Sequence, residues 1–153
     1  MIRILFICHG NICRSPMAEF VFRNMVRERG LADQFEIASS ATSREEIGNP
    51  VHPGTKRKLR EFGIHTDGKY AVQLTKADYN NYDYLLAMEQ RNIINAMRIL
   101  GSDPEAKVAR LLDYSAKPRD IADPWYTGNF DVTYNDIYEG CELHYAMMQY
   151  SMK

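Results

Sequence analysis

The first sixteen residues constrain the fold of this chain more than any other stretch. Residues 2–7 (IRILFI) form a short and nearly continuous apolar run, which is typical of a parallel strand buried on both faces. Pro16 favours a first helical turn and Ser15 can cap it, and apolar residues then recur at helical spacing until Gly30. The stretch ICHGNICRSP, residues 7–16, is therefore predicted to join a strand to a helix.

Weaker signals place further elements along the chain. Apolar and β-branched runs predict strands over residues 35–38, 84–88 and 108–112. Apolar periodicity predicts helices over residues 54–62, over a short piece capped by Thr75, over residues 89–100 and from Asp131 onward. Residues 39–53 are rich in Ser, Thr, Gly, Asn and Pro, which indicates an irregular segment.

Alternating strands and helices predict an α/β fold. We expect a three-layer sandwich in which a small parallel sheet of about four strands is flanked by helices on both faces. Ligands bind beyond the carboxyl ends of such strands, so the loop after the first strand is predicted to bind the ligand. No repeat or linker interrupts the 153 residues, and we expect a single domain over residues 1–153.

Charge and cysteine content exclude several kinds of partner. The net charge of −1 gives no overall cationic field for binding nucleic acid or an anionic membrane. The apolar N-terminal run is too short for a signal sequence or a membrane span, so a cytoplasmic location is expected. The three cysteines are an odd number, which argues against a disulfide framework. No second cysteine pair or histidine cluster is present, so neither a metal nor another cofactor is predicted.

The loop after the first strand is suited to binding an anion. Its backbone N–H groups can form a concave nest, and the following helix adds partial positive charge. Gly10 allows close approach of the backbone, Asn11 tolerates a left-handed conformation, and Arg14 offers two parallel donors to a phosphate. Cys8 would lie at the base of this nest, where a thiolate is favoured and can attack phosphorus in line. The predicted phosphate-binding loop comprises His9, Gly10, Asn11, Ile12, Cys13 and Arg14.

A second candidate segment, DPWYTGNFD, occupies residues 123–131. Asp123 is the candidate general acid that protonates a leaving group and later activates water. The residues alone leave three other aspartates open for this role: Asp113, Asp120 and Asp131. Trp125 and Tyr126 lie in a loop bounded by proline and glycine, and we expect them to form the wall of a cleft for an aromatic substrate.

These motifs resemble those of the low-molecular-weight protein tyrosine phosphatase family. The resemblance rests on Cys8-x5-Arg14-Ser15 after the first strand together with the late pair Asp123-Pro124. It extends over residues 39–43, EIGNP at 46–50 and YDYLLAM at 82–88, so it covers nearly the whole chain. It implies hydrolysis of tyrosine-phosphorylated proteins without a metal, and inhibition by inorganic phosphate or other oxyanions.

The resemblance also implies roles for individual residues. Cys8 would form a phosphocysteine, Arg14 would stabilise charge in the transition state, and Asp123 would act as acid and then base. Ser15 would hydrogen-bond the Cys8 sulfur, and Asn11 would hold the loop with help from two supporting residues, Ser39 and Asn92. Cys13 has two interpretations, which do not exclude each other: a small buried residue, or a guard that traps oxidised Cys8 as a disulfide.

Two positions at the expected cleft bear on specificity. Glu45 stands where the family often has an aromatic residue, which makes the rim more acidic. Ile12 stands where the related protein arginine phosphatases carry a small polar residue, and it favours a flat phenyl ring.

A thiol-dependent arsenate reductase would need cysteines between Cys13 and Cys141, and the chain has none there. A phosphoanion-binding module without turnover is the remaining alternative.

Overall fold

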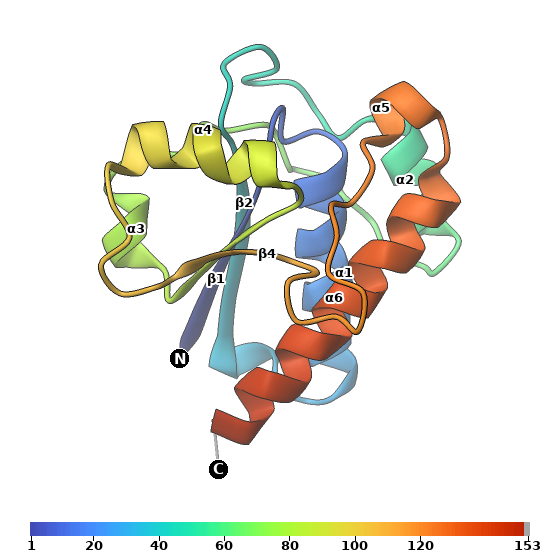
Figure 1. Ribbon diagram of the computed structural model, residues 1–153. Coiled ribbons are helices and arrows are strands. Elements are labelled where there is room, and N and C mark those ends of the chain that lie inside the picture. The colour runs from blue at the N-terminus through green and yellow to red at the C-terminus, as the bar shows by residue number, and fades with distance from the viewer. Residues whose placement is uncertain (152–153) are drawn as a thin grey trace.

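The computed structural model describes residues 1–151, in which strands and helices alternate (Figure 1). In chain order the elements are β1 (Ile2–Cys8), α1 (Arg14–Glu28), the 3₁₀ helix η1 (Ala32–Gln34), β2 (Phe35–Ala41), α2 (Pro53–Arg60), α3 (Asp78–Asn81), β3 (Tyr84–Ala87), α4 (Gln90–Leu100), β4 (Val108–Arg110), α5 (Pro124–Thr127) and α6 (Phe130–Ser151). Among these residues no helix is both long enough and apolar enough to cross a lipid bilayer.

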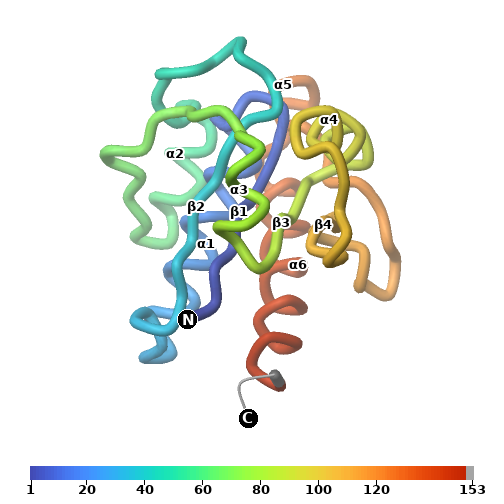
Figure 2. Tube along the Cα trace, turned by 90° about the vertical axis from the view of Figure 1, so that its left-hand side faces the viewer, coloured from blue at the N-terminus to red at the C-terminus, as the bar shows by residue number. Residues whose placement is uncertain are grey.

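The strands form one parallel four-stranded sheet in the order β2-β1-β3-β4. Helices cover both of its faces, with α1 and α6 on one side and α3 and α4 on the other (Figures 1 and 2). The predicted α/β sandwich is thus confirmed. The chain leaves β1 toward β2 on one side and later returns to β3 on the other, so the strand order reverses at β1. The loop after β1 lies at this reversal, where ligands bind in such folds.

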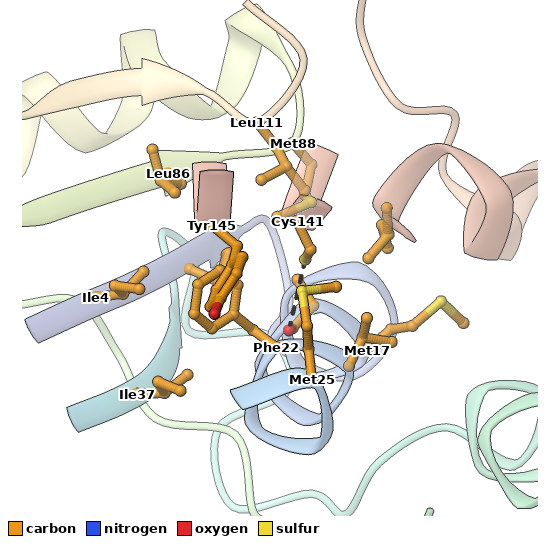
Figure 3. Close-up of a cluster of buried hydrophobic side chains, with 14 of the residues drawn as sticks. Ile4, Met17, Phe22, Met25, Ile37, Leu86, Met88, Leu111, Cys141 and Tyr145 are labelled. Atoms are coloured by element: carbon orange, nitrogen blue, oxygen red, sulfur yellow. Dashed lines mark hydrogen bonds between the residues drawn. The ribbon is translucent and has the colours of Figure 1, made fainter. Parts of the chain in front are cut away.

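The larger core lies between the sheet and the pair α1 and α6. Phe22 of α1 contacts Tyr145 of α6 with a ring-centroid distance of 6.4 Å, and both pack against apolar side chains of the sheet such as Ile4 and Leu86 (Figure 3). A smaller core on the opposite face joins the sheet to α3 and α4. Strands buried on both faces explain why the first strand reads as a continuous apolar run.

Several expected boundaries differ in the structure. Strand β2 continues to Ala41, because the β1–β2 ladder extends as far as the pair of Cys8 with Ala41. Ser15 does not cap α1: the helix already begins at Arg14 and no side chain caps it. Thr75 does not cap α3, which begins at Asp78. Helix α5 forms where the sequence indicated only a loop.

Gly140 in α6 provides a test of the packing in the larger core. A Cβ atom at this position would lie 2.5 Å from Cγ of Leu111, a side chain with 0% exposure. Alanine usually stabilises a helix by about 1 kcal/mol relative to glycine, but overpacking a core costs roughly 1–3 kcal/mol. We therefore expect Gly140→Ala to lower the free energy of unfolding, measured by urea denaturation. Asn135→Ala, at an exposed position of α6, is the control and should not destabilise the protein; equal stability of the two variants would contradict the packing argument.

Candidate active site

The loop after β1 forms the base of a cavity of about 130 Å³. Strand β1 delivers Cys8 to one end of the loop, and α1 begins with Arg14 at the other. Side chains from the segments after β2 and around α5 complete the wall. The lining residues are Cys8, His9, Gly10, Ile12, Cys13, Arg14, Glu45, Glu46, Asp123, Trp125 and Tyr126. The structure thus brings together the loop and the cleft residues that the sequence indicated.

Hydrogen-bond donors converge on the Cys8 sulfur. The backbone N–H groups of Asn11 and Ser15 point at Sγ with distances of 3.3 and 3.4 Å. The Ser15 hydroxyl oxygen lies 3.0 Å from the sulfur and accepts a bond of 2.7 Å from Nδ2 of Asn11. Because that amide nitrogen can only donate, the hydroxyl proton is free to point at the sulfur. These three donors are placed to hydrogen-bond negative charge on the sulfur.

Asn11 ties the loop to its surroundings. Its backbone has a φ of 59°, in the left-handed region that asparagine tolerates. Its amide donates to the Ser39 hydroxyl on β2 at 2.9 Å and accepts from the backbone N–H of Val72 at 3.1 Å. The side chain is 1% exposed, so these bonds are shielded from water. Asn11 and Ser39 therefore connect the loop to two neighbouring segments.

A buried charged cluster supports Ser39, and the sequence analysis did not anticipate it. The Ser39 hydroxyl donates to Oε1 of Glu19 on α1 at 2.6 Å. Glu19 is 2% exposed and pairs with Arg23 at 2.8 Å and with Lys69 at 3.5 Å. Burial lowers the pKa of Lys69, and the Glu19 carboxylate partly opposes this. The only signal of this cluster in the sequence is Glu19 itself, an acidic residue about one turn into a helix that has an apolar side.

Arg14 is buried with 1% exposure and is held from two sides. Its Nη1 donates to the carbonyl of Ile121 at 2.8 Å and lies 3.3 Å from Oε2 of Glu89. Its Nη2 lies 3.5 Å from Oδ2 of Asp123. Glu89 was not anticipated, since the sequence analysis included it only as the first residue of the helix expected over residues 89–100. These contacts fix the plane of the guanidinium beside the loop.

Asn92 lies in the first turn of α4 and is 1% exposed. Its Oδ1 accepts from the backbone N–H groups of Met88 and Glu89, both at 3.1 Å. The bond from Glu89 forms a capping box at the start of α4, together with a bond that the Glu89 side chain accepts from the backbone N–H of Asn92. Within the described part of the chain Asn92 therefore reaches the loop only indirectly, by fixing Glu89 against Arg14.

Asp123 is the aspartate that the fold brings to the cavity. It caps α5 by accepting from the backbone N–H of Trp125 at 3.0 Å. The three other candidates form ion pairs and do not line the cavity: Asp113 and Asp120 with Arg110, at 2.7 and 3.1 Å, and Asp131 with Lys58 at 2.8 Å.

The two sides of the cavity mouth differ in chemistry. Trp125 and Tyr126 of α5 are 57% and 84% exposed, and Trp125 packs edge-on against His52. Glu45 and Glu46 come from the loop after β2, and Oε2 of Glu45 lies 3.0 Å from Nε2 of His9. The mouth therefore has an aromatic side and an acidic side.

Cys13 also lies in the cavity wall, where its thiol is buried. Burial, together with the nearby charges of Cys8 and Asp123, raises the pKa of its thiol to about 12. It therefore stays protonated at neutral pH. Cys141 is buried in the larger core, where burial also raises the pKa of its thiol (Figure 3). Among residues 1–151 no group of three or more His, Cys, Asp or Glu side chains could hold a metal ion.

A phosphatase family combines this fold with such a loop. Residues 3–152 match the model of the low molecular weight phosphotyrosine protein phosphatase family, and the chain belongs to this family. It is similar to the low molecular weight protein-tyrosine-phosphatase YfkJ of Bacillus subtilis, with 41% identity over 97% of each chain. These findings identify the protein as a hydrolase of the protein phosphatase class.

Solved structures of relatives agree with this assignment. The crystal structure of Bacillus subtilis YfkJ has a TM-score of 0.96 and 40% identity, over 100% of this chain and 98% of that one. The low molecular weight protein tyrosine phosphatase SP-PTP of Streptococcus pyogenes has a TM-score of 0.86 and 36% identity, over 96% and 93%. Vibrio vulnificus Wzb in complex with benzylphosphonate has a TM-score of 0.79 and 28% identity, over 93% and 95%.

The bond between Ser15 and the Cys8 sulfur can be tested by substitution. A hydrogen bond to a charged group contributes about 1.5–3 kcal/mol, so we expect Ser15→Ala to lower kcat about 10- to 100-fold with p-nitrophenyl phosphate. Alkylation of Cys8 by iodoacetate at neutral pH should slow as well. Ser40→Ala is the matched control, because the Ser40 hydroxyl is buried without a hydrogen-bond partner within residues 1–151. Equal kcat in the two variants would show that the Ser15 contact does not stabilise the thiolate.

Proposed function

We propose that this phosphatase hydrolyses phosphotyrosine in proteins through a phosphocysteine on Cys8. The observation that carries the proposal is the convergence of Asn11 N–H, Ser15 N–H and the Ser15 hydroxyl on one sulfur at the base of the cavity. Arg14 and Asp123 line the same cavity. The Wzb complex holds benzylphosphonate, an aromatic ring joined to a phosphorus oxyanion, and a similar ligand suits the aromatic mouth of this cavity.

In the first step the Cys8 thiolate attacks phosphorus. An S–P bond forms as the P–O bond to the tyrosine ring breaks, and Asp123 donates its proton to the departing phenolate oxygen. The loop N–H groups and Arg14 hold the equatorial oxygens, where negative charge develops. The products are tyrosine and a phosphocysteine.

In the second step water attacks the phosphocysteine. Asp123, now ionised, removes a proton from the water while the new P–O bond forms and the S–P bond breaks. The sulfur leaves as a thiolate, which the donors from Asn11 and Ser15 stabilise. Inorganic phosphate is released, and by the same contacts it and other oxyanions are expected to inhibit. Neither step requires a metal or another cofactor.

Ile12 supports tyrosine over arginine as the phosphorylated residue. Its side chain is 8% exposed and lines the cavity with Trp125 and Tyr126. These apolar groups match the faces of a phenyl ring, whereas a guanidinium would need polar partners there. An arsenate reductase activity is disfavoured because no cysteine lies between Cys13 and Cys141.

A redox role for Cys13 is a second part of the proposal. Peroxide would convert the Cys8 thiolate to a sulfenic acid, and the Cys13 thiol would condense with it to form a disulfide and release water. Both cysteines line the same cavity. Because burial raises the pKa of Cys13 to about 12, Cys13 is a thiol before oxidation and remains available to condense with the sulfenic acid.

Substitution of Cys8 tests the nucleophile. We expect Cys8→Ser to abolish turnover of p-nitrophenyl phosphate and of a phosphotyrosine peptide, because a hydroxyl in this site stays protonated and is a weak nucleophile. Vanadate binding, followed by calorimetry, should persist because the loop donors remain. Turnover by Cys8→Ser at the wild-type rate would contradict the phosphocysteine step. Loss of turnover in wild-type enzyme treated with EDTA would contradict the metal-independent reaction.

The general acid can be tested by varying the leaving group. Asp123→Ala should slow aryl phosphates with poorly acidic phenols by about 10²- to 10⁴-fold and those with strongly acidic phenols much less. The measurement is kcat/KM across a series of substituted phenyl phosphates. Asp131→Ala is the control, since Asp131 pairs with Lys58 outside the cavity. A loss in Asp123→Ala that does not depend on the phenol would argue against proton transfer from Asp123.

A further inference from the structure

The acidic side of the cavity mouth is built onto the phosphate-binding loop itself. In the segment after β2, the backbone N–H of Thr42 donates to the carbonyl of Cys8, and that of Ser43 to the carbonyl of His9, both at 3.0 Å. Farther along, Gly48 N–H donates to the carbonyl of Ala71 at 2.9 Å. This segment rises at the same end of the sheet as α5 (Figures 1 and 2). The backbone of this segment is therefore fixed directly beside the loop after β1.

Two carboxylates occupy the rim within this segment. The Glu45 side chain is 71% exposed and contacts His9. Glu46 packs over Gly10: a Cβ atom built on that glycine would lie 3.3 Å from Cγ of Glu46. Oε2 of Glu46 accepts a bond of 2.6 Å from Asn49. Both carboxylates thus lie at the mouth, above the loop that binds the phosphate.

Few cations balance these carboxylates. Arg14 is buried at the base, where the phosphate would bind. Arg44, the neighbour of Glu45, donates to Oε1 of Gln73 at 3.0 Å and does not line the cavity. His9 is the one further basic side chain among the lining residues within the described chain. The rim that meets residues next to the phosphotyrosine is therefore acidic.

We propose that Glu45 and Glu46 are specificity-determining residues that select phosphotyrosines flanked by lysine or arginine. The inference rests on the proposed phosphotyrosine phosphatase function and names the substrate class within it. Arg14 and the loop bind the phosphate at the base of the cavity, while the substrate residues on either side of the phosphotyrosine contact the rim. A cationic flank is attracted to the two carboxylates, whereas an acidic flank is repelled. Exposed charge pairs are individually weak, so each carboxylate is expected to change kcat/KM about two- to fivefold.

The test compares two phosphotyrosine peptides of equal length, one with lysine and one with glutamate on both sides of the phosphotyrosine. The quantity measured is the ratio of kcat/KM for the basic peptide to that for the acidic one. In the wild-type enzyme we expect a ratio of about ten or more at low salt, falling toward one in 1 M NaCl as the charges are screened. In Glu45→Gln with Glu46→Gln the ratio should approach one even at low salt.

Glu36→Gln is the matched control, because Glu36 is an exposed glutamate that pairs with Arg3 at the amino ends of the strands. It should keep the wild-type ratio. A wild-type ratio near one, or a high ratio that persists in the double variant, would overturn the inference while leaving the phosphatase function intact. Hydrolysis of neither peptide by the wild-type enzyme would instead remove the proposed function, and the inference with it.

Discussion

The site depends on hydrogen-bond donors that converge on one buried sulfur. The donors come from a loop that is short and fixed at both ends, by β1 at Cys8 and by α1 at Arg14. The N–H groups of such a loop can point toward the sulfur only if the other polar groups of the loop have hydrogen-bond partners in the neighbouring segments. Asn11 meets this requirement, since its amide bonds to Ser15, to Ser39 and to the backbone of Val72.

The support behind the loop extends well beyond it. Ser39 connects Asn11 to Glu19, a buried carboxylate whose charge is balanced by Arg23 and Lys69. A buried charge of this kind is tolerated only with such partners. Glu89 plays a comparable part for Arg14 on the other side of the site. The loop and Arg14 are thus held by residues of α1 on one face of the sheet and by Glu89 at the start of α4 on the other.

In the proposed reaction, the base and the mouth of the cavity recognise different parts of the substrate. The base would bind the phosphate, and any phosphate monoester would find the same donors there. The side chains at the mouth would then contact only the group attached to that phosphate.

Features formed by residues that are adjacent in the chain could be predicted from the sequence, whereas features that depend on contacts between distant segments could not. The first strand, the loop and α1 are continuous in the chain, so apolar patterning and the residue types at Cys8 and Arg14 were enough to predict them. The boundary of β2 was missed because its last residues are small and polar and are held by pairing with β1. Without the family resemblance the choice among four aspartates stayed open, since residue type alone does not distinguish a cavity residue from one in a surface ion pair; the resemblance favoured Asp123, which lines the cavity.

The sequence by itself therefore determined the α/β class and the position of the loop between the first strand and α1, because strand, loop and helix signals arise from neighbouring residues. Only the tertiary structure decided which distant side chains meet that loop. It placed Asp123 in the cavity, Glu89 on Arg14, Glu19 behind Ser39, and Glu45 beside His9. Such contacts join segments far apart in the chain, and they exist only once the packed sheet and helices fix the distances between them.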